Sequence, residues 1–165
     1  MPATPARKRP RETTQSAATT PISTIMSRNV TSVRSGTSLD VLAELLLARG
    51  LSRVPVLDVN GRLIGIVSKT DLVKQTHEAG DTLEESPLDA SLADVRGLHV
   101  HGEGATVDDL MSQPVTAVGE STSIQRAAQL MVGSQVHGLP VVTGSGELTG
   151  FVSTMDILAW LSGVR

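Results

Sequence analysis

Apolar residues recur at helical spacing in two segments of the chain that lie 85 positions apart. Positions three and four residues apart share one face of an α-helix, so each segment predicts a helix with one buried face. The apolar positions are Leu39, Leu42, Ala43 and Leu46 in the first segment and Ile124, Ala127, Ala128 and Met131 in the second. Thr37 and Thr122 precede these segments, and we expect them to cap the two helices. Gln125, three residues after Thr122, would complete a capping box there.

Two short β-branched or apolar runs follow the first helix, at residues 54–58 and 63–67. The pair Asn60-Gly61 between them tolerates the positive φ that a tight hairpin turn needs. The second copy has Gly144, Ser145 and Gly146 at this place. After each hairpin, Ser68 or Ser153 can cap a closing helix. Each copy therefore predicts the order strand, helix, strand, strand, helix, in an α+β fold.

The two copies share many residues at the constant offset of 85, without a gap. The residues of the hairpin and closing helix that recur are Pro55, Val56, Gly61, Leu63, Gly65, Val67, Ser68 and Asp71, as Pro140, Val141, Gly146, Leu148, Gly150, Val152, Ser153 and Asp156. A repeat this regular indicates two copies of one supersecondary unit that bury surface against each other. We expect one pseudo-symmetric domain of two βαββα units packed together.

Composition and charge divide the 165 residues into four parts: a tail at 1–21, a first repeat at 22–75, a connector at 76–106 and a second repeat at 107–165. The tail has four basic residues against one acidic residue amid Pro, Thr, Ser and Ala, so we expect it to be disordered. A transit peptide or a nucleic-acid-binding arm stays open, although four charges bind polyanions weakly and we expect no nucleic acid. The connector has seven acidic residues against Arg96, and we interpret it as an acidic spacer with a short helix near 88–95 as the alternative.

The chain has no cysteine, which fits a reducing compartment and excludes disulfides and cysteine metal sites. Its longest apolar stretch is too short to span a bilayer, and no apolar segment follows the basic cluster as a secretory signal would require. We therefore expect a soluble, cytoplasmic protein without a membrane partner.

The motif Ser-x-x-Asp occurs once in each copy, as Ser68 with Asp71 and as Ser153 with Asp156. A serine N-cap with a carboxylate three residues later satisfies helix amides, and capping alone explains the motif. A helix start is also a phosphate site, and a carboxylate can accept two hydrogen bonds from ribose hydroxyls. The residues by themselves favour capping and leave both interpretations open.

The order of elements and two motifs resemble the cystathionine beta-synthase (CBS) domain, which occurs in tandem pairs. The x-x-h-P-V motif is Ser52 to Val56 and His137 to Val141, and the G-h-V-S-x-x-D motif is Gly65 to Asp71 and Gly150 to Asp156. The resemblance covers residues 22–75 and 107–162. It implies a regulatory module that binds AMP, ADP, ATP or S-adenosylmethionine between the copies, with serine at ribose or phosphate and aspartate at the ribose diol.

Carried over residue by residue, the resemblance implies two clefts, each built from both copies. One would use Thr116, Val136 and His137 with Ile66, Ser68 and Asp71, and the other Thr31, Leu51 and Ser52 with Phe151, Ser153 and Asp156. The adenine is expected to lie between aliphatic side chains. The copies differ at Arg53 and Lys69, which correspond to Gly138 and Thr154. We expect these two cations to make the Asp71 cleft prefer AMP, ADP or ATP, and the Asp156 cleft to be weaker or suited to S-adenosylmethionine.

No catalytic motif is apparent, so we expect no enzyme and no required cofactor. The spacing of His99, His101 and Glu103 could suit a metal if the segment were extended, but the three residues lie in the connector and nothing else completes the site, so we interpret them as a polar loop and expect no metal site. The family pairs commonly dimerise through their helices, so the resemblance implies a homodimer that regulates a separate protein. Trp160 could pack within the subunit or between subunits. The alternative is a dimeric scaffold that senses no ligand.

Overall fold

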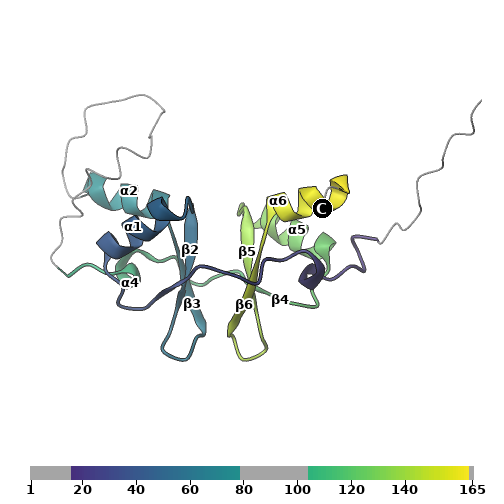
Figure 1. Cartoon of the computed structure of the whole chain (residues 1–165), viewed down its shortest axis with the longest axis horizontal. Helices are drawn as coiled ribbons and strands as arrows, with labels where there is room; N and C mark the ends of the chain where they lie inside the picture. Colours follow the sequence, from purple (N-terminus) through teal and green to yellow (C-terminus); the bar gives the residue numbers. More distant parts are fainter. Residues whose placement is uncertain (1–15, 79–103, 164–165) are drawn as a thin grey trace, which may run out of the picture.

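Two similar units of strands and helices lie side by side in the computed structural model, which describes residues 16–78 and 104–163 (Figure 1). The first unit contains β1 (Val33–Arg34), α1 (Leu39–Ala48), β2 (Arg53–Leu57), β3 (Leu63–Ser68) and α2 (Lys69–Glu78). The second contains β4 (Val118–Gly119), α5 (Ile124–Gly133), β5 (Gly138–Val142), β6 (Leu148–Ser153) and α6 (Thr154–Ser162). A 3-10 helix, η1 (Ile22–Thr24), precedes the first unit, and α4 (Val107–Leu110) precedes the second. The predicted order of elements is confirmed in both copies.

Each unit has a three-stranded sheet in which the middle strand is the first strand of the hairpin. β1 is parallel to β2 and β2 is antiparallel to β3, and β4, β5 and β6 repeat this arrangement. The register is equivalent in both copies, with Pro55 opposite Ile66 and Pro140 opposite Phe151. Gly61 and Gly146 have φ of 79° and 87°, the left-handed conformation that the hairpin turns require.

The first helix of each unit begins one residue later than the sequence predicts. Ser38 and Ser123 are the N-caps, and their hydroxyl oxygens accept hydrogen bonds from the amides of Val41 and Arg126. Capping by Thr37 and Thr122 was therefore wrong. The Thr37 hydroxyl instead donates to the Arg34 carbonyl at 2.6 Å, which closes the turn after β1 and leaves the next residue to cap the helix.

The segments that precede the two units are exchanged between them. Residues 16–27, the N-terminal arm, pack on the second unit, where the Thr20 and Ala17 carbonyls accept from the first two amides of α5, each at 2.9 Å. Residues 104–112, the connecting arm, pack on the first unit, and the Ala105 carbonyl accepts from the Leu39 amide at 3.4 Å. Each arm thus satisfies helix amides that have no partner within the helix.

The exchange also determines which side chains form the two cores. Ile22, Ile25 and Met26 are buried with the second unit, while Val107 is buried with the first, and Trp160 packs against the second core. Thr20 is 5% exposed and residues 16–21 are hydrogen bonded, so the expected disorder of residues 1–21 was wrong for this part; residues 1–15 lie outside the described residues. The ends of the connector are structured too, since α2 extends to Glu78 and residues 104–106 join the first unit; the helix considered near 88–95 lies outside the described residues.

Backbone pairs hold each arm on its unit, and a further contact joins the two units. Ser27 and Phe151 exchange two backbone hydrogen bonds, both at 2.9 Å, and Ile66 and Ser112 form the equivalent pair. The tips of the hairpins also meet, where the Leu63 amide donates to the Gly146 carbonyl at 2.9 Å. Over residues 16–78 and 104–163, each helix is too short or too polar to cross a membrane.

Candidate functional site

The two Ser-x-x-Asp motifs have the same geometry at the starts of α2 and α6. In each, one carboxylate oxygen, Oδ2, accepts from the serine amide at 2.8 and 2.7 Å and from the serine hydroxyl at 2.6 Å. The serine oxygen in turn accepts from the amide of Asp71 or Asp156, at 3.4 and 3.2 Å. This is a capping box, so the capping interpretation is confirmed. Each motif therefore stabilises the start of its helix without any ligand.

A cavity of about 350 Å³, which we call the Ser153 pocket, lies where the two units meet. This volume is at the lower end of the range for pockets that bind small molecules. It is open to solvent on one side and is lined by Ser27, Asn29, Val30, Thr31, Gly50, Leu51, Ser52, Arg53, Pro55, His137, Phe151 and Ser153. Residues of both units contribute, so the pocket requires their association.

Strand alternation explains why β2 contributes to this pocket. Val54 and Val56 point into the first core, and successive side chains of a strand point to opposite faces. Arg53 and Pro55 therefore face away from their own helices, and both line the pocket beside residues of the second unit. The N-terminal arm brings Ser27 to Phe151 through its backbone pairing, and the chain that follows the arm provides the adjacent wall as far as Thr31.

Five of the six residues expected in the second cleft line the Ser153 pocket: Thr31, Leu51, Ser52, Phe151 and Ser153. Asp156, the sixth, is outside the lining, and its carboxylate caps α6. Arg53 and His137 were assigned to the other cleft but line this one. Arg53 pairs with Ser68 in the sheet, but its side chain lies on the face turned toward the second unit, where it lines the Ser153 pocket.

The remaining residues expected in the first cleft do not line the Ser153 pocket. They are Thr116, Val136, Ile66, Ser68, Lys69 and Asp71. Ile66 pairs with Ser112 of the connecting arm, and the Lys69 amide donates to the Ser52 carbonyl at 3.0 Å where α2 begins. These contacts place Ile66 and Ser68 at a junction equivalent to that of Phe151 and Ser153.

Several lining residues were not predicted from the sequence, among them Ser27, Asn29 and Pro55. Pro55 could have been found from alternation along the strand, because it lies two positions after Arg53 on the same face. Ser27 and Asn29 could not, since their place depends on the exchange of the arm. The possible metal ligands His99, His101 and Glu103 lie outside the described residues, and within the described residues no group of three metal-binding side chains occurs.

An exposed ion pair holds the chain beside the Ser153 pocket. The Arg28 guanidinium donates to Oε1 and Oε2 of Glu120 at 2.9 and 3.3 Å, and joins the end of the arm to the segment before α5. The hydrogen bond from Arg28 holds the pKa of the Glu120 carboxyl below its ordinary value. Arg28 lies between two lining residues, Ser27 and Asn29, so the pair restrains one wall of the pocket.

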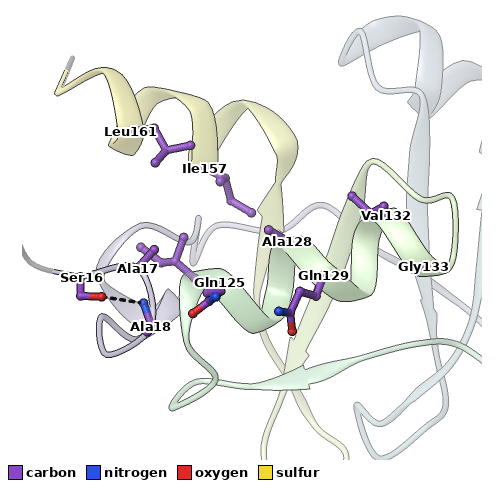
Figure 2. A pocket seen from close by; sticks show the side chains of 11 residues that line it. Ser16, Ala17, Ala18, Gln125, Ala128, Gln129, Val132, Gly133, Ile157 and Leu161 are labelled. Carbon is purple, nitrogen blue, oxygen red and sulfur yellow. Dashed lines mark hydrogen bonds between the residues drawn. The ribbon is translucent and has the colours of Figure 1, made fainter.

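A second cavity, of about 710 Å³, lies among α5, α6 and the N-terminal arm (Figure 2). Figure 2 shows Ile157 and Leu161 of α6 on one side and Ala128 and Val132 of α5 on another. We call this the α5–α6 groove; its lining is almost entirely apolar, and Val132 and Leu161 are 80% and 63% exposed. A groove of this kind suits an apolar partner surface rather than a phosphate.

The model of the CBS domain family matches this chain twice, at residues 22–78 and 107–163. The chain belongs to the CBS domain family. The two matches correspond to the two units of the fold, so the chain contains a tandem CBS pair.

Relatives of this CBS pair include a CBS domain-containing protein of Dictyostelium discoideum, 31% identical over 134 residues, which are 81% of this chain and 86% of the relative. The chloroplastic protein CBSX2 of Arabidopsis thaliana is 28% identical over 138 residues, 79% of this chain and 58% of CBSX2. An uncharacterised protein of Methanocaldococcus jannaschii matches over 33% of its length at 25% identity. This chain thus spans only part of some relatives.

Solved CBS pairs share the fold. CBSX2 in complex with AMP is 27% identical, with a TM-score of 0.68 over 88% of this chain and 99% of that one. The CBS pair of protein MJ0100, solved with 5′-methylthioadenosine and S-adenosyl-L-methionine, has a TM-score of 0.67 over 86% of this chain and 99% of its own. At 20% identity, the second likeness establishes the fold alone.

Proposed function

We propose that this CBS pair is a regulatory module that binds an adenine nucleotide in the Ser153 pocket and acts on a separate protein. The observation that carries the proposal is the convergence of Arg53, Phe151 and Ser153, from both units, on one cavity of about 350 Å³. Such a cavity offers a cation for phosphate, a hydroxyl for ribose or phosphate and an apolar surface for a base. The complex of CBSX2 with AMP supports an adenine nucleotide as the ligand.

The charge of the lining favours a phosphorylated ligand over S-adenosylmethionine. Of the twelve lining residues, Arg53 is permanently charged, His137 is an exposed imidazole, and none is Asp or Glu. A guanidinium attracts phosphate and repels the sulfonium cation of S-adenosylmethionine. This order reverses our expectation from the sequence, because Arg53 belongs to the pocket of the second motif.

A charge-removing substitution tests the role of Arg53. Calorimetry on the full chain is expected to show AMP binding that Arg53→Gln weakens by about tenfold or more, since a hydrogen bond to a charged group contributes about 1.5–3 kcal/mol. Adenosine binding should change little because it has no phosphate. Arg34→Gln, at an exposed position of β1 outside the pocket lining, is the matched control. Equal losses for AMP and adenosine would contradict the assignment of Arg53 to phosphate.

A second nucleotide site is proposed at the equivalent junction of the first motif, with Ile66, Ser68, Lys69 and Asp71 facing Thr116 and Val136. Its support is the equivalence of the Ile66–Ser112 and Phe151–Ser27 backbone pairs. We expect it to be the weaker site, because Arg53 lines the other pocket.

Regulation would follow from the position of the Ser153 pocket between the units. A ligand can shift the equilibrium between two relative arrangements of the units only if it binds one arrangement more tightly than the other. A ligand that contacts both units can bind the two arrangements with different affinity. The apolar α5–α6 groove supports a second element of the proposal, a homodimer or another protein contact through this face. If AMP, ADP, ATP and S-adenosylmethionine all gave neither heat nor a thermal shift, the non-sensing scaffold would replace the sensor.

A further inference from the structure

The ring of Phe151 lies directly against Gly138. A Cβ atom added at residue 138 would lie 2.5 Å from Cε1 and 2.9 Å from Cζ of Phe151, closer than real Cβ atoms approach a neighbour. Gly138 is buried, and its φ is not among the positive values of the chain. Its backbone conformation therefore does not require glycine. Residue 138 must instead be glycine because the Phe151 ring occupies the space that a side chain would need.

The same two positions in the first unit carry a different pair of residues. Arg53 corresponds to Gly138 and Ile66 corresponds to Phe151, at equivalent places in equivalent strands. The first unit thus has a cation and an aliphatic side chain where the second has a glycine and an aromatic ring that lies against it. Because Arg53 and Phe151 line the same pocket, one unit supplies the charge and the other supplies the ring.

We propose that Phe151 is the base-stacking wall of the Ser153 pocket, and that Gly138 is the residue that gives the ring its place. This assignment rests on the proposed function and identifies the residue that recognises the base. An aromatic face stacks on any planar base and adds affinity without reading its hydrogen-bonding edge. The pocket therefore selects a planar base linked to an anion. An aliphatic residue at this position, such as Ile66 in the first unit, lacks that stacking face.

The composition of the chain permits a direct measurement, because Phe151 is its only phenylalanine. Biosynthetic labelling with 3-fluorophenylalanine gives one ¹⁹F resonance, and a ring flip can place the fluorine at Cε2, away from Gly138. AMP is expected to shift this resonance as it saturates the pocket. Ribose 5-phosphate, which has the same sugar and phosphate but no base, should leave it nearly unchanged.

Calorimetry on variants tests whether the ring contributes affinity. Phe151→Ile, which installs the residue of the first unit, should weaken AMP binding by about fivefold or more, whereas Phe151→Tyr keeps the ring and should preserve it. Gly138→Ala should weaken binding in the same direction, because the new methyl group displaces the ring. Ile64→Val, on the same strand of the first unit but packed against the first core and outside the pocket lining, is the matched control and should leave AMP binding unchanged. Thermal melting of each variant confirms that it folds.

The outcomes distinguish this inference from the proposed function. One outcome overturns the stacking wall and leaves the nucleotide site standing. In it, AMP binds the unsubstituted chain and Arg53→Gln weakens this binding, but AMP does not shift the ¹⁹F resonance and Phe151→Ile binds AMP normally. If no nucleotide binds the unsubstituted chain, both fail. A shifted resonance with weakened AMP binding in Phe151→Ile and intact ribose 5-phosphate binding supports both.

Discussion

Glu120 is the carboxylate through which we expect pH to act on the N-terminal arm. Arg28 and Glu120 are 60% and 39% exposed, so solvent screens their attraction and the stabilisation is modest. The pKa of Glu120 is lowered in the folded chain by the Arg28 hydrogen bond. A carboxyl group whose pKa is lower in the folded than in the unfolded chain stabilises the fold at pH values above its unfolded pKa. This stabilisation is lost as the pH falls through the folded pKa.

Glu120→Gln is therefore expected to lower the melting temperature at neutral pH by a small amount that disappears in acid. Melting curves of both proteins from pH 7 to pH 3 measure it, and added salt should shrink the neutral-pH difference as it screens the pair. Glu44→Gln, at an exposed position on α1, is the control for loss of a surface charge. A difference that persisted unchanged into acid would show that the carboxylate charge is not its cause.

At the same scale, the sequence predicted capping by Ser68 and Ser153 correctly, because a capping box is a local pattern four residues long. Helix initiation at Thr37 and Thr122 failed by one position, since serine follows threonine in both copies and either hydroxyl can cap. The position of Arg53 differs from the expectation for another reason. Arg53 and Ser68 belong to the same copy and are paired in its sheet, whereas the pocket that the Arg53 side chain lines depends on which face of β2 meets the second unit.

At the scale of elements, Ile22 and Val107 are equivalent positions of the two copies, and each is buried in the core of the other unit. Both are fully buried, yet Ile22 belongs to the core of the second unit and Val107 to that of the first. Ile22→Ala should destabilise the chain by about 2–5 kcal/mol, the usual cost of truncating a buried Ile. The loss of protection should appear first in α5 and α6, which lie far from residue 22 in the sequence.

Hydrogen exchange measured by mass spectrometry locates the effect. In Ile22→Ala, amides of α5 and α6 should exchange faster while those of α1 keep most of their protection; Val107→Ala, the matched variant, should show the opposite pattern. If Ile22→Ala loosened α1 and left α5 protected, the exchange of the arms would be wrong.

The order of strands and helices followed from periodicity because each element has its own apolar pattern. The exchange of the arms did not follow from any such pattern. The segment 16–27 is short and has no long periodic apolar face. Its carbonyls accept hydrogen bonds from amides at the start of α5, about a hundred residues later in the chain. A tail judged by composition alone is therefore assigned as disordered up to Pro21, although its last six residues are packed.

At the scale of the whole molecule, the two units are similar in fold and unequal in surface. Of the large apolar side chains that are exposed, Val132, Met155, Leu158 and Leu161 belong to α5 and α6, while the first unit contributes Val41 and Val59. Met155 corresponds to Thr70 in the first unit, so this apolar excess is specific to the second copy. Of these, Val132 and Leu161 line the α5–α6 groove, and exposed apolar side chains around a groove are typical of a contact surface.

We therefore expect two chains to associate through the α5–α6 groove. Val132→Lys combined with Leu161→Lys should raise the dimer dissociation constant by about tenfold or more, because a charged side chain at the centre of an apolar contact loses its hydration. Both positions are more than half exposed, so the melting temperature of the isolated subunit should change little. Val59→Lys, 84% exposed at the hairpin tip, is the control that adds charge away from the groove. Light scattering across a concentration series measures all three proteins; a monomer at every concentration, or equal dimerisation of all three, would rule out this surface as the contact.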